Sequence, residues 1–262
     1  ILEDRKKLSG LIRAELVEMS KVYSSPRRTE IASDASEVRM EDLIADDQVA
    51  VTISHEGYVK RLALSEYRLQ GRGGKGVTGA ETKEGDFVER LIIATNHQYL
   101  LVLTKTGRLF WLRVFDIPEA GRYSRGRALI NMLQVDAEDR IAACVPVRSF
   151  EKGYLLTVTA LGTIRKTPLE GFNRPRPSGI IGVYIDEGDR LIGAATLDEG
   201  QEILLATKLG QSIRFAEGDV RAMGRASSGV GGIKLEEGDE VVSLVVLEAG
   251  RSILTVCANG VG

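Results

Sequence analysis

The sequence contains few of the residues that build catalytic, disulfide or metal centres. Its 262 residues include two histidines and two cysteines. Cys144 and Cys257 lie far apart in apolar runs, so we expect buried thiols in a reducing compartment and no disulfide framework. His55 and His97 have no serine or cysteine partner in their sequence context. We therefore expect no catalytic centre, no metal site and no cofactor in this chain.

Long hydrophobic runs and a strong net charge are also missing. No apolar run approaches the roughly 18 residues of a membrane-spanning helix and no signal peptide is visible, so we expect a cytoplasmic protein without a membrane partner. A formal net charge of −2 gives no overall basicity to indicate a nucleic-acid partner. Aromatic residues make up only 5%, too few for platforms that stack single strands. The chain starts without Met, and we expect it to be a fragment.

One amphipathic helix is expected near the N-terminus. Apolar side chains recur at steps of three and four residues from Leu8 to Tyr23, which places them on one helix face. The helix should end at Ser24 and Ser25, because the residue before Pro26 is pushed out of the α region. A polar run over residues 32–37 follows and is typical of a linker. We place a first segment at residues 1–31 and a larger domain at residues 32–262.

From Val49 onward the pattern changes to short β-rich runs separated by glycine turns, and it repeats about every 50 residues. The turn glycines are Gly57, Gly107, Gly162, Gly210 and Gly260. An acidic marker recurs in the same register: Glu84-Gly85-Asp86, Glu138-Asp139, Glu187-Gly188-Asp189 and Glu237-Gly238-Asp239. The strands expected are 49–54, 99–104, 154–159, 202–207 and 252–257 before the turns, and 91–95, 141–147, 191–197 and 241–247 after the markers. The two markers predict an all-β, propeller-like array.

The stretch from Gln70 to Gly76 holds four glycines and two cations, a composition suited to phosphate. It formally matches the dinucleotide fingerprint G-x-G-x-x-G, but that motif needs a helix at its third glycine, and Val77-Thr78-Gly79 cannot open one. A P-loop is excluded, because Gly76 rather than Ser or Thr follows Lys75. A flexible glycine-rich turn with incidental charge stays as the plain alternative.

Charge follows the repeat as well. Cations follow each turn glycine, and acids collect around the second marker. If the units are placed equivalently around an axis, the cations line one part of the rim and the acids another, and the local field would attract an anionic polymer. The candidate binding residues are Gln70, Arg72, Gly73, Gly74, Lys75 and Gly76 in the glycine-rich stretch, and Lys60, Arg61, Arg68, Arg108, Arg122, Arg125, Arg127, Arg165, Lys166, Arg174, Arg176, Arg214, Arg221 and Arg225 elsewhere.

The glycine-rich stretch resembles the signature box of the C-terminal domains of DNA gyrase A subunits, except that Gly71 stands where the usual form has a basic residue. Residues 122–133, 179–193 and 221–247 resemble successive blades of that family. Residues 1–31 resemble the end of the helical arm that leads into the domain. The resemblance covers essentially the whole chain, and the near-intact box favours gyrase over the related topoisomerase IV, whose boxes tend to be degraded.

The resemblance implies a β-pinwheel, in which four-stranded blades of about 50 residues exchange strands with their neighbours. Six blades are usual in the family, whereas we count four complete repeats and the start of a fifth, so the array would be truncated. The implied function is sequence-tolerant binding and chiral wrapping of duplex DNA around a basic rim, in support of negative supercoiling and in association with the nucleoid. The box is implied to act in ring closure and in the last stages of wrapping.

The implied partners, besides duplex DNA, are the gyrase B subunit, together with the rest of the gyrase A polypeptide. ATP, Mg and the active-site tyrosine would belong to other domains of that enzyme, so this chain is expected to bind and not to catalyse. Two alternatives stay open. One is the C-terminal DNA-binding domain of topoisomerase IV, and the other is a propeller-like scaffold that binds proteins.

Overall fold

The computed structural model describes residues 4–25, 29, 40–67, 85–121, 123–136, 138–225 and 227–256. The chain divides into two compact units, residues 1–43 and residues 44–262. The sequence places the boundary between residues 31 and 32, but residues 30–39 lie outside the described part of the chain. The two units are described separately.

The first unit contains the predicted helix, α1 (Arg5–Tyr23), followed by a short 3₁₀ helix, η1 (Met40–Leu43). Asp4 caps α1, since its carboxylate accepts hydrogen bonds from the backbone N–H groups of Lys6 and Lys7 at 3.0 and 3.4 Å. The helix ends where expected, at Ser24 in an extended conformation. None of its described residues is buried. None of the described helices is both long enough and apolar enough to cross a membrane.

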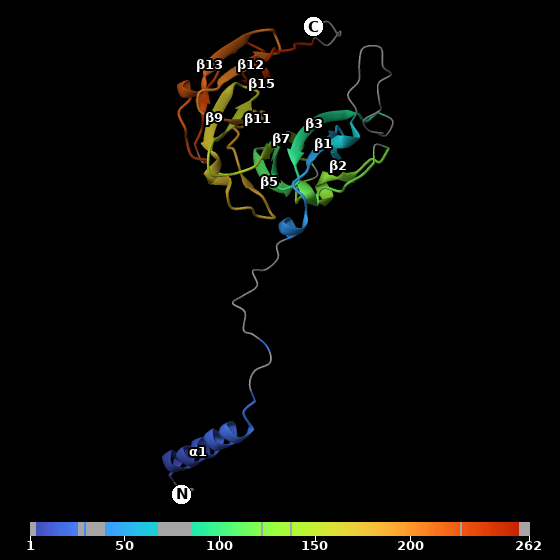
Figure 1. Cartoon of the computed structure of the whole chain (residues 1–262). Coiled ribbons are helices and arrows are strands. Elements are labelled where there is room, and N and C mark those ends of the chain that lie inside the picture. The colour runs from blue at the N-terminus through green and yellow to red at the C-terminus, as the bar shows by residue number, and fades with distance from the viewer. Residues whose placement is uncertain are drawn as a thin grey trace. The chain divides into compact units, whose positions relative to one another are not determined.

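The second unit consists of four antiparallel sheets, which follow one another as blades (Figure 1). Blade 1 has the strand order β3 (Val88–Thr95), β1 (Gln48–Ser54), β2 (Tyr58–Ala63), β6 (Arg127–Ala128). Blade 2 has the order β7 (Ile141–Val147), β4 (Tyr99–Thr104), β5 (Arg108–Arg113), β10 (Ile180–Ile181). Blade 3 has the order β11 (Leu191–Leu197), β8 (Tyr154–Thr159), β9 (Thr163–Pro168), β14 (Val230–Gly231). Blade 4 has β15 (Val241–Leu247), β12 (Glu202–Thr207) and β13 (Ser212–Ala216).

Neighbouring blades exchange strands. In chain order β6 follows β4 and β5 of blade 2, yet it pairs with β2 of blade 1, with Tyr58 opposite Ala128 and Val59 opposite Arg127. Strand β10 returns in the same way to β5, and β14 returns to β9. The predicted all-β array of blades is therefore confirmed, with a single N-terminal α-helix among the described residues.

The fourth repeat and the start of the fifth differ from the expectation. Blade 4 has three strands among the described residues, so β13 has one neighbour instead of two. Residues 251–256 form no strand, although the repeat predicts one at 252–257. A strand is stabilised by its hydrogen-bonded neighbours, and within the described residues this segment has none.

The hairpin turns are built from glycine and aspartate together. Gly107 has φ +86°, a conformation that side chains disfavour, and a methyl group on it would lie 2.2 Å from the carbonyl oxygen of Val183. The acidic markers cap these turns: each Asp carboxylate accepts a hydrogen bond from a turn N–H. The pairs are Asp86 with Glu56, Asp139 with Thr106, Asp189 with Leu161 and Asp239 with Leu209. These four aspartates thus hold the turns of their own blades, while neighbouring acids such as Glu138, Glu187 and Glu237 are exposed. That the acids form a second charged zone of the rim stays a prediction.

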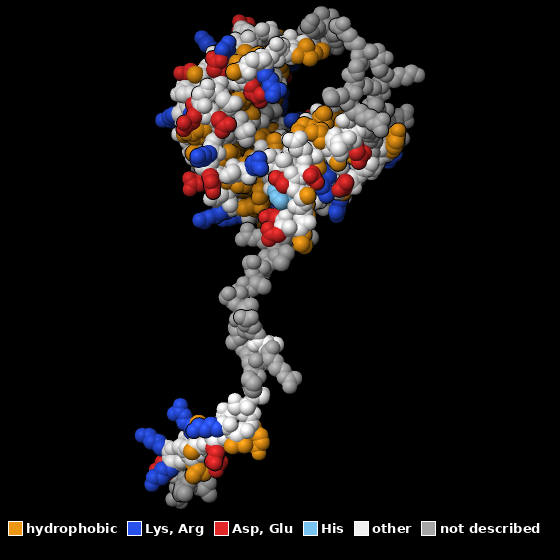
Figure 2. All heavy atoms as spheres, viewed as in Figure 1, with side chains coloured by type: hydrophobic (Ala, Val, Ile, Leu, Met, Phe, Trp, Pro, Cys, Tyr) orange, Lys and Arg blue, Asp and Glu red, His pale blue; other side chains and the backbone are white. Residues whose placement is uncertain are grey.

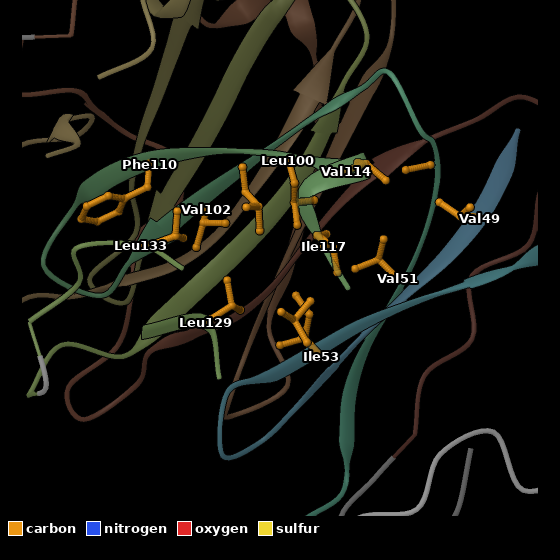
Figure 3. Close-up of a cluster of buried hydrophobic side chains, with 13 residues drawn as sticks. Val49, Val51, Ile53, Leu100, Val102, Phe110, Val114, Ile117, Leu129 and Leu133 are labelled. Carbon is orange, nitrogen blue, oxygen red and sulfur yellow. The ribbon is translucent and has the colours of Figure 1, made fainter. Parts of the chain in front are cut away.

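The apolar side chains form three clusters, each shared by two consecutive blades. The first joins blades 1 and 2 through Val51 and Ile53 on one side and Leu100, Val102 and Phe110 on the other (Figure 3). Blades 2 and 3 present apolar residues on both faces, so that each of them packs against the blade before it and the blade after it. Short 3₁₀ turns follow the second strand of each repeat: η2 (Leu64–Glu66), η3 (Val114–Asp116), η5 (Leu169–Phe172) and η6 (Glu217–Asp219). One further 3₁₀ turn, η4 (Leu129–Asn131), follows β6.

Candidate nucleic-acid interface

One position in the second strand of each of the first three repeats carries a hydrogen-bond donor that reaches the next blade. This position lies four residues after the turn glycine and is Arg61, Trp111 or Lys166. Arg61 Nε donates to Ile117 O at 2.7 Å, Trp111 Nε1 to Phe172 O at 2.8 Å, and Lys166 Nζ to Glu217 O at 3.1 Å. Each acceptor belongs to, or directly follows, the 3₁₀ turn of the next repeat. Arg61 and Lys166 thus join blades.

Lys166 also forms a buried ion pair. Its Nζ lies 2.5 Å from Glu217 Oε1, and the two side chains are 6% and 11% exposed. The hydrogen bond from Lys166 outweighs the effect of burial and lowers the pKa of Glu217. The Lys166 ammonium also lies 4.7 Å from the centre of the Tyr154 ring, a cation–π contact. The Lys166 ammonium therefore has its partners inside the protein.

The position one residue earlier points to the opposite face of the strand and holds Lys60, Phe110 or Arg165. Lys60 is 2% exposed, and its Nζ donates to Gly121 O at 3.2 Å and to Ser124 O at 2.9 Å. Arg165 is also 2% exposed and donates to Tyr184 O at 3.3 Å. Burial lowers the pKa of both groups, and nearby Asp186 partly opposes this at Arg165.

Four of the predicted DNA-binding residues are therefore inside the protein. Lys60, Arg165 and Lys166 are buried, and the Arg61 side chain is 15% exposed and bound to Asn96 Oδ1 as well as to Ile117 O. The prediction that they face a rim is wrong for this structure. Side chains so enclosed cannot reach a phosphate without separating two blades.

Arg108 and Arg214 are accessible but have partners. Arg108 Nη1 lies 3.2 Å from Asp136 Oδ2, and its Nη2 donates to Ser178 O at 2.7 Å. Arg214 is paired with Glu202 through both of the glutamate oxygens. The hydrogen bond from Arg214 to Glu202 raises the pKa of its guanidinium. An arginine with a carboxylate partner offers a phosphate less net charge than a free one.

Six of the predicted arginines are exposed and, within the described part of the chain, have no hydrogen-bond or ion-pair partner. They lie in the connections that run from a 3₁₀ turn to an exchanged strand, or in the exchanged strand itself. They are Arg125, Arg127, Arg174, Arg176, Arg221 and Arg225. Three successive repeats thus place free guanidinium groups in the equivalent segment, although not at the same position within it. We call these six residues the connection arginines.

The connection arginines lie at one edge of the blades. In each of the first three sheets the exchanged strand forms one edge, and β3, β7 or β11 forms the other. Strand β11 contacts both β7 and β15. The edges formed by β3, β7 and β11 are therefore the inner edges, where the blades meet, and the exchanged strands form the outer edges. On the visible face of the molecule, lysine and arginine side chains project around the margin of the blades with acidic side chains between them (Figure 2).

Two connection arginines flank a groove of about 700 Å³ on blade 3. Arg174 follows η5 of that blade, and Arg225 belongs to the segment that blade 4 sends back to it. Gly171 lies beside Arg225, since a methyl group on Gly171 would be in ordinary van der Waals contact, at 3.9 Å, with the Arg225 Cγ and Cδ atoms. The returning segment is held by a hydrogen bond of 2.8 Å from Met223 N to Lys166 O. The groove therefore depends on the exchange between blades 3 and 4.

The remaining candidates, Arg68, Gln70, Arg72, Gly73, Gly74, Lys75, Gly76 and Arg122, lie outside the described residues. The sequence reasoning missed the inter-blade role of Trp111. A signal for it is present, because the position four residues after the turn glycine always carries a side-chain N–H donor: Arg61, Trp111, Lys166 and Arg214. Within the described ranges, no three His, Cys, Asp or Glu residues are grouped as a metal site would require.

Comparison with known proteins gives a consistent result. The family model of the DNA gyrase C-terminal domain, a β-propeller, matches residues 48–95, 98–148, 153–198 and 201–248, which correspond to the four repeats. The DNA gyrase A protein of Salmonella typhimurium is 44% identical over 257 residues, 98% of this chain and 29% of that protein. The DNA gyrase A protein of Escherichia coli is 43% identical over 203 residues, 77% of this chain and 23% of that protein. The chain thus spans less than a third of the length of these relatives.

Two solved structures are similar. The C-terminal domain of DNA topoisomerase IV aligns with a TM-score of 0.64 and 28% identity, covering 79% of this chain and 63% of that one. A DNA gyrase A C-terminal domain aligns with a TM-score of 0.65 and 25% identity, covering 76% of this chain and 65% of that one.

Proposed function

Because this chain belongs to the family of DNA gyrase C-terminal domains, we propose that it binds duplex DNA along the outer edge of its blades and wraps it there, as part of a gyrase A polypeptide. The observation that carries the proposal is the set of connection arginines. Their side chains are exposed, have no partner among the described residues, and recur in the equivalent segment of three successive repeats.

The proposed contacts are to phosphate. Arginine presents a planar fork of N–H donors that matches phosphate oxygens, and such contacts carry no base information. Binding is therefore expected to be sequence-tolerant and strongly dependent on salt, because each neutralised phosphate releases counterions. A formal net charge of −2 does not oppose this, since the local field decides the attraction, the aspartates of the markers are engaged in turns, and the free cations lie at one edge.

Wrapping requires DNA to follow the succession of blades. Bending 20–30 base pairs by 40–90° costs on the order of 1–6 kcal/mol. Connection arginines from successive blades supply phosphate contacts at intervals along the edge, and each contact offsets part of that cost. The groove between Arg174 and Arg225 is the proposed site where the sugar–phosphate backbone lies deepest.

In the whole enzyme this chain would present a wrapped DNA segment to the cleavage domains, and negative supercoils would follow from strand passage that is driven by ATP. The gyrase B subunit, ATP, Mg and the nucleoid-associated location enter only through this proposal. Gyrase is preferred to topoisomerase IV because the relatives at 43–44% identity are gyrase A proteins.

A salt titration of duplex binding tests the proposal. We expect log K to fall with log salt by about 0.9 for each phosphate contact. Arg174→Ala with Arg225→Ala should weaken binding at low salt. It should also reduce the slope of log K against log salt by about the contribution of two phosphate contacts. The matched control is Lys152→Ala with Lys234→Ala, which removes the same charge from exposed cations that lie outside these connections and likewise have no side-chain partner among the described residues.

Two results would contradict the proposal. The first is an equal effect of the two double variants, which would leave only general electrostatics. The second is negligible duplex binding at moderate salt, which would favour a scaffold that binds proteins. The wrap itself is tested by ligating nicked circles with the protein bound and measuring the change in linking number. Binding without a change in linking number would restrict the function to DNA binding.

A further inference from the structure

A cavity of about 300 Å³ lies between blades 1 and 2. Its walls come from the β1–β2 turn, from β3, from the β4–β5 turn and from the connection that leads from β6 to β7. We propose that this cavity, which we call the inter-blade cavity, binds a small amphipathic anion, a molecule with a flat apolar body and one acidic group. The site is independent of the proposed DNA interface, since it contains none of the connection arginines.

The cavity exists because one connection is longer than its counterparts. The connection from β6 to β7 has twelve residues, 129–140, and begins with the 3₁₀ turn η4. The equivalent connections from β10 to β11 and from β14 to β15 have nine residues each, 182–190 and 232–240. All three start alike, because Leu129 N, Gly182 N and Gly232 N donate to the carbonyl oxygen of the turn glycine in the preceding blade. They diverge after that point.

The space around the turn glycines differs with the length of the connection. A methyl group on Gly107 would lie 2.9 Å from a side-chain atom of Ile185, and one on Gly162 would lie 3.1 Å from a side-chain atom of Ile233. The shorter connections thus cover these two turns. A methyl group on Gly57 would have no atom of the described residues within 4 Å. The longer connection leaves the turn of blade 1 uncovered, and the space over it forms part of the cavity.

The interior of the cavity is apolar on one side. Ile53, Leu129, Val135 and Ile141 line it, and Leu129 and Ile53 also belong to the buried cluster shared by blades 1 and 2. A volume of about 300 Å³ is at the lower end of the range for small-molecule sites. This volume suits a bicyclic aromatic group or a compound of similar size.

The rim carries two cations with no carboxylate partner. Lys105 and Arg140 line the cavity, are exposed, and have no side-chain partner within the described ranges. In blade 4 the equivalent positions are Lys208 and Glu240, which form an ion pair of 3.5 Å, and Glu240 is also paired with Arg190 of blade 3. Blade 2 has Arg140 where blade 4 has Glu240. The carboxylate that pairs with the lysine in blade 4 therefore has no counterpart at the equivalent position in blade 2.

The acids that line the cavity do not replace that anion. Glu89 is bound by His55 at 2.9 Å and lies 3.7 Å from Arg90. The Asp139 carboxylate accepts a hydrogen bond from Thr106 N at 3.3 Å and contacts the Thr106 hydroxyl. Glu56 is exposed on the turn. An acidic ligand group between Lys105 and Arg140 would supply the missing charge, and its apolar body would fill the space over Gly57.

Two fluorescent probes test this assignment. Anilinonaphthalene sulfonate is anionic, and phenylnaphthylamine has nearly the same aromatic body without the charge. We expect the anionic probe to bind at one saturable site and more tightly than the neutral one. Lys105→Ala with Arg140→Ala should weaken the anionic probe about tenfold or more, the effect of one lost charge-assisted contact or two, and leave the neutral probe unchanged. Lys208→Ala, at the equivalent position in blade 4, is the control and should change neither affinity.

Val135→Phe fills the cavity and should abolish binding of both probes. A thermal melt establishes that each variant is folded. If Val135→Phe does not fold, Lys105→Ala with Arg140→Ala still tests the proposal. Equal affinity of the two probes, unchanged binding in the double variant, absence of a saturable site, or displacement of the probe by excess duplex DNA would each overturn the proposal.

Discussion

Lys166 Nζ lies 2.5 Å from Glu217 Oε1 in the contact between blades 3 and 4, with both side chains almost completely shielded from water. A buried pair of this kind is costly to break, because removing one partner leaves the other charge desolvated and unpaired. We expect Lys166→Met to lower the free energy of unfolding by about 3 kcal/mol, within the roughly 3–5 kcal/mol typical of such changes.

Urea denaturation of the two single variants and of Lys166→Met with Glu217→Leu measures the coupling. The double variant should recover most of the stability, because no charge is left unpaired. Simple additivity of the two losses would show that the pair is not coupled.

Stability should also depend on the protonation of Glu217. The hydrogen bond from Lys166 lowers the pKa of this carboxyl below its ordinary value of 4.5 in the folded state. The unfolded chain therefore binds the proton first as pH falls. The stabilising contribution is fully present above the unfolded pKa and is lost as pH falls through the lower, folded value. Melting temperatures between neutral and acidic pH test this, and Glu217→Gln should reduce the loss on acidification. An unchanged acid slope in Glu217→Gln would assign the loss to other carboxyls.

Two turn glycines with the same backbone conformation should respond differently to alanine. Gly57 and Gly107 have φ +84° and +86°, so each substitution carries the strain of a left-handed conformation, about 1–2 kcal/mol. At Gly107 the new methyl group would also collide with Val183 O, whereas at Gly57 it would meet no atom within 4 Å in the part of the chain that the structure describes. Gly107→Ala should therefore destabilise the protein clearly more than Gly57→Ala in thermal or urea denaturation. Equal losses would mean that the connection over Gly107 moves without cost.

The glycine-rich box gives a prediction that rests on the sequence. Arg72→Ala with Lys75→Ala should impair the change in linking number more than it impairs simple duplex binding, if the box acts in the last stage of wrapping. Arg174→Ala with Arg225→Ala serves for comparison, because it should reduce binding itself. Equal loss in the two assays for the box variant would contradict a special role of the box.

The sequence predicted the long strands well and the fate of the strand cations poorly. Strands β4, β7, β8, β11, β12 and β15 have the predicted limits, because continuous apolar runs bounded by turn residues mark both ends of each strand. The exchanged strands β6, β10 and β14 are two residues long, and no periodicity can be read from so few positions.

The cations were misplaced for a different reason. A lysine such as Lys60 looks the same in sequence whether it faces water or points between two sheets. Its burial depends on Gly121 and Ser124, whose carbonyl oxygens reach it from the following repeat. Such partners are fixed by the exchange of strands, which a single chain's pattern does not show. The connection arginines could be predicted, because they lie among Gly, Pro and Ser residues that are typical of exposed loops.

The exchange of strands also dictates an order of assembly during translation. Tyr58–Ala63 leaves the ribosome well before Arg127–Ala128, the strand that completes its sheet, and the first two strands of blade 2 are made in between. A sheet is therefore complete only when the following repeat has supplied its exchanged strand, and until then the newest sheet on the nascent chain is one strand short. The blades are then completed in order from the N-terminus, each one when the next repeat supplies its exchanged strand.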